Sequence, residues 1–171
     1  MRRLLILAAF ALAFAAPPAA RAQGEQTYTS GGADYAFDFP NATWRAVPRA
    51  DGDTTRAEFV YGDRSDALLR VRKEIVGENT APRDLAERDR DNKLRFQRGY
   101  VEGKLEPFAG RFKGVASGYE FTGAGKPMVG VVYYLQADPR TIYVLHFTGS
   151  KESLLRLRAQ TDAIARSFRT K

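Results

Sequence analysis

The residues best suited to acid–base chemistry are few, and the chain contains a single histidine, His146. A general base needs a positioned partner and access to the substrate, whereas Leu145 and Phe147 flank His146 in an apolar segment. Histidine is intermediate in its tendency to be buried, so we interpret His146 as a hydrogen-bonded structural residue. One histidine and no cysteine cannot build a tetrahedral zinc site of the usual kind. The sequence therefore predicts no catalytic residue, no metal site and no cofactor.

Three short motifs could in principle hold an ion or a phosphate. Residues 51–53 (Asp-Gly-Asp) and 63–66 (Asp-Arg-Ser-Asp) offer oxygen ligands to calcium, but neither has the length and terminal glutamate of an EF-hand loop. Ordinary turns explain both better, because turns favour Asp, Ser and Gly, and calcium binding stays open. Residues 123–126 (Gly-Ala-Gly-Lys) resemble a phosphate loop, yet Pro127 stands where such a loop has Ser or Thr. We expect a hairpin there.

Tyrosines on the expected strands and the many carboxylates leave two further kinds of site open. Tyr119, Tyr133, Tyr134 and Tyr143 could line a ligand groove, although strand aromatics more often pack on core faces or cross-strand neighbours. A pair of carboxylates could hydrolyse a glycosidic bond, and their pairing in space is not visible in a sequence. A carboxylate-based hydrolase is therefore the catalytic alternative that we retain.

The start of the chain has the three parts of a secretory signal peptide. Arg2 and Arg3 form a basic start, residues 4–16 are apolar, and residues 20–22 (Ala-Arg-Ala) fit a cleavage site. The apolar run is shorter than the about 20 residues that a membrane-spanning helix needs, and no later run approaches that length. We expect residues 1–22 to be removed after export and the remaining chain not to span a membrane.

Composition narrows the compartment and the partner. Loss of three signal-peptide arginines lowers the formal charge from +7 to +4, and so mild and dispersed a charge does not support nucleic-acid binding. The chain has no cysteine, which excludes disulfides and thiol chemistry. With the Ala-rich and Arg-rich composition, this favours a bacterial envelope protein in the periplasm, with an extracellular location as the alternative. We expect residues 23–34 to be a flexible lead-in and residues 35–171 a single domain.

The candidate residues must be positioned by a mixture of strands and helices. Residues 35–39 alternate aromatic with small or polar side chains and stop at Pro40, as a half-buried strand does. Trp44 follows, and we expect it to lie over the edge of the core. The other expected elements are strands 56–61 and 67–76, a helix over 81–97, strands 100–108, 112–122, 128–136 and 141–148, and a helix after Ser150.

The two expected helices differ in character. The helix over residues 81–97 is heavily charged, with Thr80 as its N-cap and with a thin apolar stripe, so we expect most of it to face water. Its predicted ion pairs are Asp84 with Arg88, Asp89 with Lys93 and Asp91 with Arg95. The last helix, capped by Ser150, is amphipathic, and its apolar stripe consists of Leu154, Leu157, Thr161, Ile164 and Phe168.

Short turns between the last four strands predict an antiparallel meander. Residues 129–135 and 142–145 are apolar on both faces, which implies strands covered on two sides. We therefore predict an α+β fold in which an antiparallel sheet is sandwiched between helices (α/β/α).

This order of elements resembles the PsbP-like family, which includes the extrinsic photosystem II subunit P and a related Ran-binding protein. The residues that carry the resemblance are mostly core positions: Tyr35, Phe37, Phe39, Pro40 and Trp44, the Tyr-Val-Leu-His-Phe segment at 143–147, and the Ile-Ala-Arg-Ser-Phe segment at 164–168. The resemblance implies an α/β/α fold used as a non-catalytic binding or assembly module.

The leading functional expectation is an exported, non-catalytic module that binds another envelope protein. The second is a carrier of a small ligand or lipid, with a pocket between sheet and helix, and the third is the carboxylate-based hydrolase. Partner identity and oligomeric state do not follow from the sequence.

Overall fold

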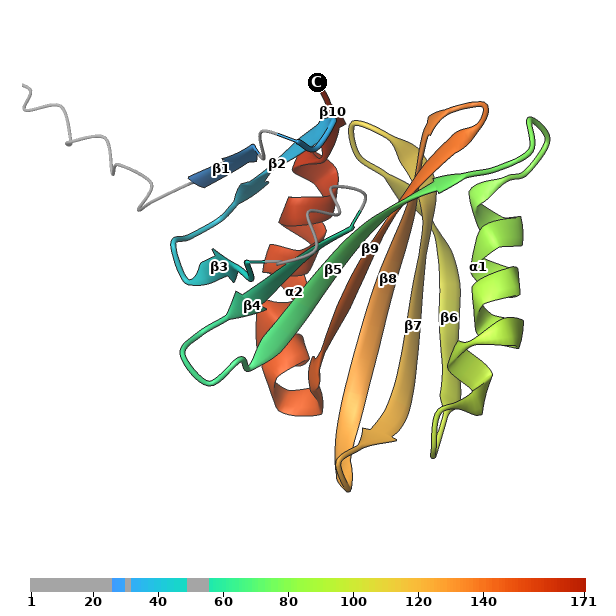
Figure 1. Cartoon of the computed structure of the whole chain (residues 1–171). Helices are drawn as coiled ribbons and strands as arrows, with labels where there is room; N and C mark the ends of the chain where they lie inside the picture. The colour runs from blue at the N-terminus through green and yellow to red at the C-terminus, as the bar shows by residue number, and fades with distance from the viewer. Residues whose placement is uncertain (1–25, 30–31, 49–55) are drawn as a thin grey trace, which may run out of the picture.

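The computed structural model describes residues 26–29, 32–48 and 56–171. Figure 1 shows a large twisted sheet with α1 on one side and α2 on the other, and a small sheet formed by the two ends of the described chain. The predicted signal peptide (residues 1–22) and the acidic segment 51–53 lie outside the described residues. The coarse fold class is confirmed, because antiparallel strands and two α-helices make up the described part of the chain as an α+β fold.

Seven of the described strands form the main sheet, in the order β3-β4-β5-β9-β8-β7-β6, and every neighbouring pair is antiparallel. The predicted meander is confirmed as β6 to β9, while β5 pairs with the other edge of β9 and makes β9 a central strand. The strands are β3 (Trp44–Ala46), β4 (Arg56–Tyr61), β5 (Ala67–Ile75), β6 (Val101–Ala109), β7 (Lys113–Gly123), β8 (Lys126–Asp138) and β9 (Thr141–Ser150).

Two predicted turns are confirmed, and both use left-handed backbone. Ala124 and Gly125 have φ values of +48° and +75° and join β7 to β8 as a two-residue hairpin, the geometry that matches the twist of paired strands. Gly62 and Ser65 have φ values of +72° and +54° in the turn between β4 and β5. The glycine-rich motif is therefore a hairpin tip.

A smaller sheet joins the two ends of the described chain in the order β1-β2-β10. Strand β2 (Tyr35–Phe39) confirms the predicted first strand, and it pairs with β1 (Gln26–Thr29) and β10 (Arg169–Thr170). Within the expected lead-in over residues 23–34, residues 26–29 form β1. The Tyr28 ring packs edge-on against Phe59, with 4.6 Å between ring centroids, and this contact helps hold the segment on the core.

Helix α2 (Lys151–Ser167) covers one face of the main sheet together with β2. The Ser150 hydroxyl accepts a hydrogen bond from the Ser153 amide at 3.1 Å, which confirms the predicted cap. The predicted apolar stripe is buried throughout. It packs with inward residues of β2, β4, β5, β8 and β9, and Trp44 is buried in the same cluster.

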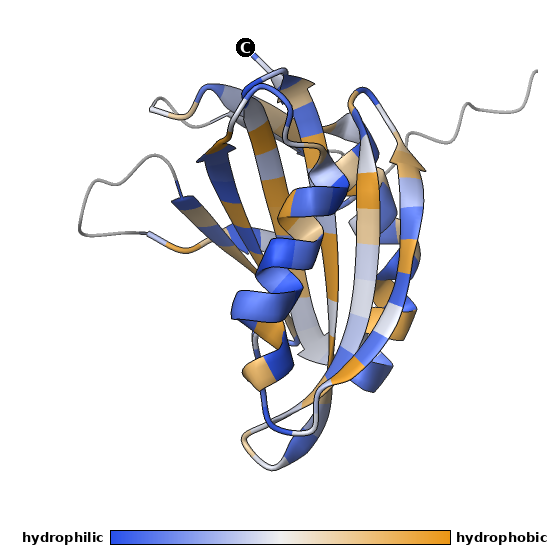
Figure 2. Ribbon diagram, turned by 90° about the vertical axis from the view of Figure 1, so that its right-hand side faces the viewer, coloured by the Kyte–Doolittle hydropathy of each residue, from blue (hydrophilic) through white to orange (hydrophobic). Residues whose placement is uncertain are grey.

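Helix α1 (Pro82–Asn92) lies against β7 and β8 on the opposite face, and a short 3-10 helix, η1 (Leu94–Phe96), follows it. Figure 2 views the molecule from this side and shows α1 as mostly hydrophilic, in front of strands with hydrophobic bands. Leu85 is completely buried beneath the helix, whereas Phe96 is 75% exposed. The helix is thus shorter than the predicted span of 81–97.

The start of α1 corrects the predicted N-cap. Ala81, not Thr80, occupies the cap position, and the Asp84 carboxylate accepts a hydrogen bond from the Ala81 amide at 2.9 Å. Because Asp84 serves this cap, the predicted pair with Arg88 does not form, and Arg88 lies 3.5 Å from Glu74 of β5. The other two predicted pairs are present, Lys93 with Asp89 at 3.0 Å and Arg95 with Asp91 at 4.0 Å.

Candidate binding groove

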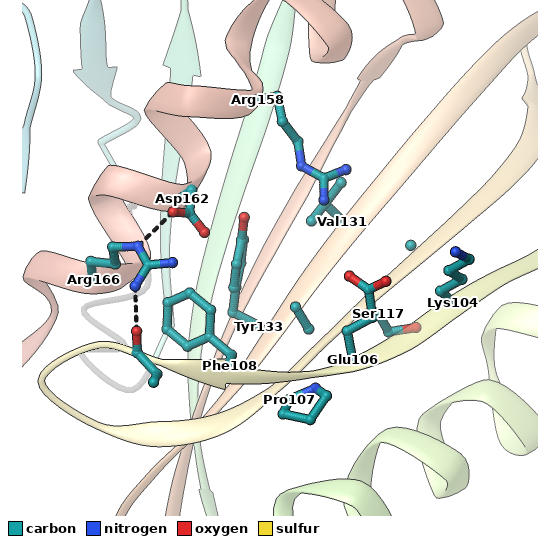
Figure 3. Close-up of a pocket in the computed structure, with 13 residues that line it drawn as sticks. Lys104, Glu106, Pro107, Phe108, Ser117, Val131, Tyr133, Arg158, Asp162 and Arg166 are labelled. Atoms are coloured by element: carbon teal, nitrogen blue, oxygen red, sulfur yellow. Dashed lines mark hydrogen bonds and ion pairs between the residues drawn. The ribbon is translucent and has the colours of Figure 1, made fainter.

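A groove of about 390 Å³ lies between α2 and strands β6, β7 and β8 (Figure 3). It forms because α2 contacts β8, β9 and β2, so the outer part of the same sheet face extends beyond the helix. Its walls are α2 and residues 104–107 of β6, and its floor is formed by β7, β8 and the Phe108 side chain of β6. The lining includes Lys104, Glu106 and Phe108 of β6, Gly118 of β7, Val131 and Tyr133 of β8, and Arg158, Asp162 and Arg166 of α2.

The floor of the groove is apolar and already well packed. Val131 is 7% exposed, Tyr133 is 2% exposed and Phe108 is 7% exposed. The Phe108 and Tyr133 rings meet edge to face, with their centroids 5.0 Å apart. The Tyr133 hydroxyl lies 3.3 Å from the Thr161 hydroxyl of α2, and burial of the phenol raises its pKa. The floor is therefore a preformed surface.

Arg166 closes one end of the groove. Its Nε donates to the Asp162 carboxylate at 2.6 Å, and its Nη1 donates to the Ala109 carbonyl at the end of β6 (Figure 3). The guanidinium also lies 5.2 Å from the centre of the Phe108 ring, within the range of a cation–π contact. Arg166 thus ties the last turn of α2 to the sheet.

A second bridge between α2 and the sheet lies at the opposite end of the helix. Lys151, the first residue of α2, donates to the Glu120 carboxylate of β7 at 2.8 Å. Glu120 is two residues beyond Gly118, and Gly118 lines the groove. Lys151 and Glu120 do not line the groove, and their bridge ties the first turn of α2 to the strand that forms part of its floor.

Two irregularities of the strands coincide in the wall and floor of the groove. The register of β6 against β7 shifts between Glu102 and Leu105, so Gly103 and Lys104 together oppose Gly118. Such a bulge redirects side chains, and Lys104 lines the groove. A Cβ on Gly103 would lie only 2.4 Å from the Gly118 carbonyl oxygen, whereas a Cβ on Gly118 would meet nothing within 4 Å. Gly118 thus leaves open space beside Lys104.

Only some of the charged side chains in the groove have an ion-pair partner. Arg166 and Asp162 neutralise each other, whereas Arg158 and Lys104 have no ion-pair or side-chain hydrogen-bond partner within the described residues. Figure 3 shows Arg158 reaching from α2 over the floor, with Lys104 on the opposite wall. Glu106 is exposed on the same strand as Lys104. Two carboxylates, Glu106 of β6 and Asp162 of α2, line the groove, and Asp162 is paired with Arg166.

The single histidine lies on the other face of the sheet, away from the groove. His146 Nε2 is 2.7 Å from the Tyr119 hydroxyl, as expected for a hydrogen-bonded structural residue. Desolvation lowers the His146 pKa to about 4, and repulsion by Arg72 and Arg70 acts in the same direction. Burial also raises the pKa of Tyr119 to about 12.

Two further tyrosines that could have lined a groove instead donate to carboxylates. The Tyr143 hydroxyl donates to Asp34 at 2.8 Å, and the Tyr134 hydroxyl donates to the buried Asp89 at 3.3 Å. Desolvation would raise the pKa of Asp34, but hydrogen bonds from Lys73 and Tyr143 hold it below its usual value. Of the four candidate tyrosines, only Tyr133 lines the groove.

Among the described residues, no group of three or more His, Cys, Asp or Glu side chains is arranged to hold a metal ion. No helix in this part of the chain has the length and hydrophobicity to cross a membrane.

The groove itself was not predicted, because its residues come from four elements that are distant in sequence. Local signals were nevertheless present. Gly103 and Gly118 interrupt segments expected to be strands, and an isolated glycine in a strand suggests a bulge or a close backbone approach. The structure shows both, because the bulge contains Gly103 and a Cβ on Gly103 would lie only 2.4 Å from the Gly118 carbonyl oxygen.

Comparisons with known proteins identify the fold. No family model and no curated protein sequence matches the chain. The solution structure of cyanobacterial PsbP from Synechocystis is similar with a TM-score of 0.60 at 13% identity, covering 92% of this chain and 98% of that one. The protein of unknown function PA94 from Pseudomonas aeruginosa has a TM-score of 0.58 at 12% identity, covering 86% and 98%.

A structure from Bacteroides thetaiotaomicron is also similar, with a TM-score of 0.58 at 12% identity. The match covers 87% of this chain but 49% of the other, so this chain spans about half of that one. At these identities the likeness concerns the fold alone. The expected PsbP-like fold is confirmed.

Proposed function

We propose that this chain is an exported, non-catalytic binding module of the bacterial envelope, and that the groove between α2 and the sheet binds another envelope protein. The observation that carries the proposal is the preformed groove, in which Lys104 and Arg158 lie on opposite walls and have no ion-pair partner in the part of the chain that the structure describes. The basic start, apolar run and small-residue cleavage pattern of residues 1–22 support export. The PsbP-like fold supports a binding role by analogy only.

In this proposal the main sheet is the middle layer of an α/β/α sandwich, with α1 and α2 as the outer layers. The two buried clusters lie on opposite faces of β8, because Tyr133 belongs to the cluster under α2 and Tyr134 to the cluster under α1. Anchoring on both faces makes the strands a rigid frame for the groove. A preformed site loses little conformational entropy on binding.

A carrier of a small ligand or lipid is the second candidate, because the groove lies between sheet and helix. The exposed area of its floor argues for a protein partner instead. An aromatic side chain presents about 150 to 250 Å², so at 2 to 7% exposure Val131, Tyr133 and Phe108 offer together roughly 30 Å². At about 25 cal/mol per Å², covering this area contributes less than about 1 kcal/mol. An acyl chain would gain little there, whereas a protein segment can also use the charged rim.

Site-specific photo-crosslinking in the native envelope tests the proposal. A photo-reactive residue in place of Glu106, in the groove, should crosslink to a specific protein, and Gly118→Leu should abolish the product by filling the groove. The matched control carries the same residue in place of Lys126, at the exposed tip of the β7–β8 hairpin. Equal crosslinking from both positions, or a product insensitive to Gly118→Leu, would contradict a role for the groove.

Native mass spectrometry of the purified protein tests the carrier alternative. A co-purifying small molecule that disappears in Gly118→Leu would favour the carrier over the protein partner.

A further inference from the structure

Given the proposed function, we infer that the segment bound in the groove is an extended, acidic stretch of polypeptide. The inference depends on three properties of the groove: its charge, its length and the open space over Gly118.

The charge of the groove selects an acidic ligand. Of its three cations, Arg166 is neutralised by Asp162 and held by the Ala109 carbonyl. Arg158 and Lys104 are exposed and have no acidic partner within the described residues. A ligand carboxylate that reaches either side chain would form a charge-assisted hydrogen bond, which is about twice as strong as a neutral one. Glu106 is the only unpaired acid among the lining residues, so the unpaired charge there is positive.

The length of the groove suits a short extended chain. On α2 its lining runs from Arg158 to Arg166, eight residues apart, and on β6 it runs from Lys104 to Ala109. At about 1.5 Å per residue the helical side is about 12 Å long. An extended strand rises about 3.3 Å per residue, so roughly four residues of an extended ligand fit within the groove.

The open space over Gly118 provides a place for one side chain of the ligand. A Cβ on Gly118 would meet no atom within 4 Å, and the bulge at Gly103 sets Lys104 beside this space. A small or apolar ligand side chain can therefore sit over Gly118 while a neighbouring carboxylate reaches Lys104 or Arg158. The floor positions the ligand, and the two cations select it.

A displayed library of random heptapeptides tests the inference on the purified protein. Peptides are selected on the unmodified chain, and those that bind Gly118→Leu equally well are discarded. Among the remaining groove-dependent peptides we expect Asp and Glu to be enriched at least threefold over the input, and Lys and Arg to be depleted. Arg158→Glu should weaken the selected peptides about tenfold. Arg156→Glu, on an exposed arginine that does not line the groove, should change their affinity less than twofold.

The outcomes separate the inference from the proposed function. Groove-dependent peptides without acidic enrichment, or with affinities insensitive to Arg158→Glu, would overturn the acidic ligand while leaving the groove as a binding site. A selection in which every peptide binds Gly118→Leu as well as the unmodified chain would overturn both. Gly118→Leu is checked for folding by circular dichroism, and Arg158→Glu provides a second, surface-exposed test of the same groove.

Discussion

The environment of His146 leads to a prediction about acid stability. The imidazole lies 2.7 Å from the Tyr119 hydroxyl and is flanked by the charges of Arg70 and Arg72. Desolvation first, and the two arginines second, lower its pKa from 6.5 to about 4, while Asp89 acts weakly in the opposite direction. The folded protein thus holds His146 neutral where the unfolded chain would protonate it.

The sign and size of the effect follow from proton linkage. Below pH 6.5 the unfolded chain binds a proton at His146 that the folded chain binds only near pH 4, so stability falls as the pH falls through this window. One pKa unit corresponds to about 1.36 kcal/mol. Between pH 7.5 and pH 5 the histidine therefore removes roughly 2 kcal/mol from the free energy of unfolding.

Urea unfolding of the unmodified protein and of His146→Gln, each at pH 7.5 and pH 5, isolates this contribution. Carboxylates titrate in both proteins, so the difference between the two pH-dependent losses reports His146 alone. We expect the unmodified protein to lose about 2 kcal/mol more than the variant over this range. Because the chain has one histidine, tag-free protein also gives a single imidazole signal in NMR. A titration midpoint at pH 6 or above in the folded state would refute the reasoning.

Three further predictions concern stability, each measured by chemical denaturation. Ile164→Ala removes a fully buried side chain of α2 and should lower the free energy of unfolding by about 2 to 5 kcal/mol. Its control, Leu155→Ala, lies at a position that is 68% exposed and should lower it by less than about 0.5 kcal/mol. Equal losses would show that α2 does not pack on the sheet through the Ile164 face. Asp89→Ala removes the carboxylate that accepts hydrogen bonds from Arg72, Lys93 and Tyr134, and it should lower the free energy of unfolding by about 2 to 4 kcal/mol. A loss below about 1 kcal/mol is typical of solvent-exposed ion pairs and would contradict the burial of Asp89. Gly125→Ala forces an alanine into left-handed backbone and should lower the free energy of unfolding by about 1 kcal/mol. Gly118→Ala has free space around the added methyl and should change the free energy of unfolding by less than about 0.5 kcal/mol. A larger loss for Gly118→Ala than for Gly125→Ala would contradict the hairpin geometry.

The elements of the fold were predictable because each depends on a local pattern. The apolar stripe of α2, from Leu154 to Phe168, has helical spacing, and the structure buries all of it. The hairpin between β7 and β8 follows from the small and glycine residues at its tip. These signals lie within a few residues of the structure that they determine.

The structure departs from the prediction where contacts between segments distant in sequence determine the local geometry. Strand β1 has little apolar sequence of its own, and Tyr28 finds its partner in Phe59, on another sheet. The helix over 81–97 divides into α1 and η1 at Lys93, whose φ of −136° lies outside the helical region, and Leu94 beyond it is buried. The groove depends in the same way on the distance between α2 and β6, which no single segment encodes.

Strand β6 forms one edge of the main sheet and has no strand neighbour on its outer side among the described residues. A regular edge of this length would be a template for pairing with a second molecule. Pro107 lacks the amide hydrogen that such pairing needs, and the irregular backbone at Gly103 breaks the ladder a few residues earlier. The bulge that directs Lys104 into the groove thus also interrupts the strand edge at which a second molecule could pair.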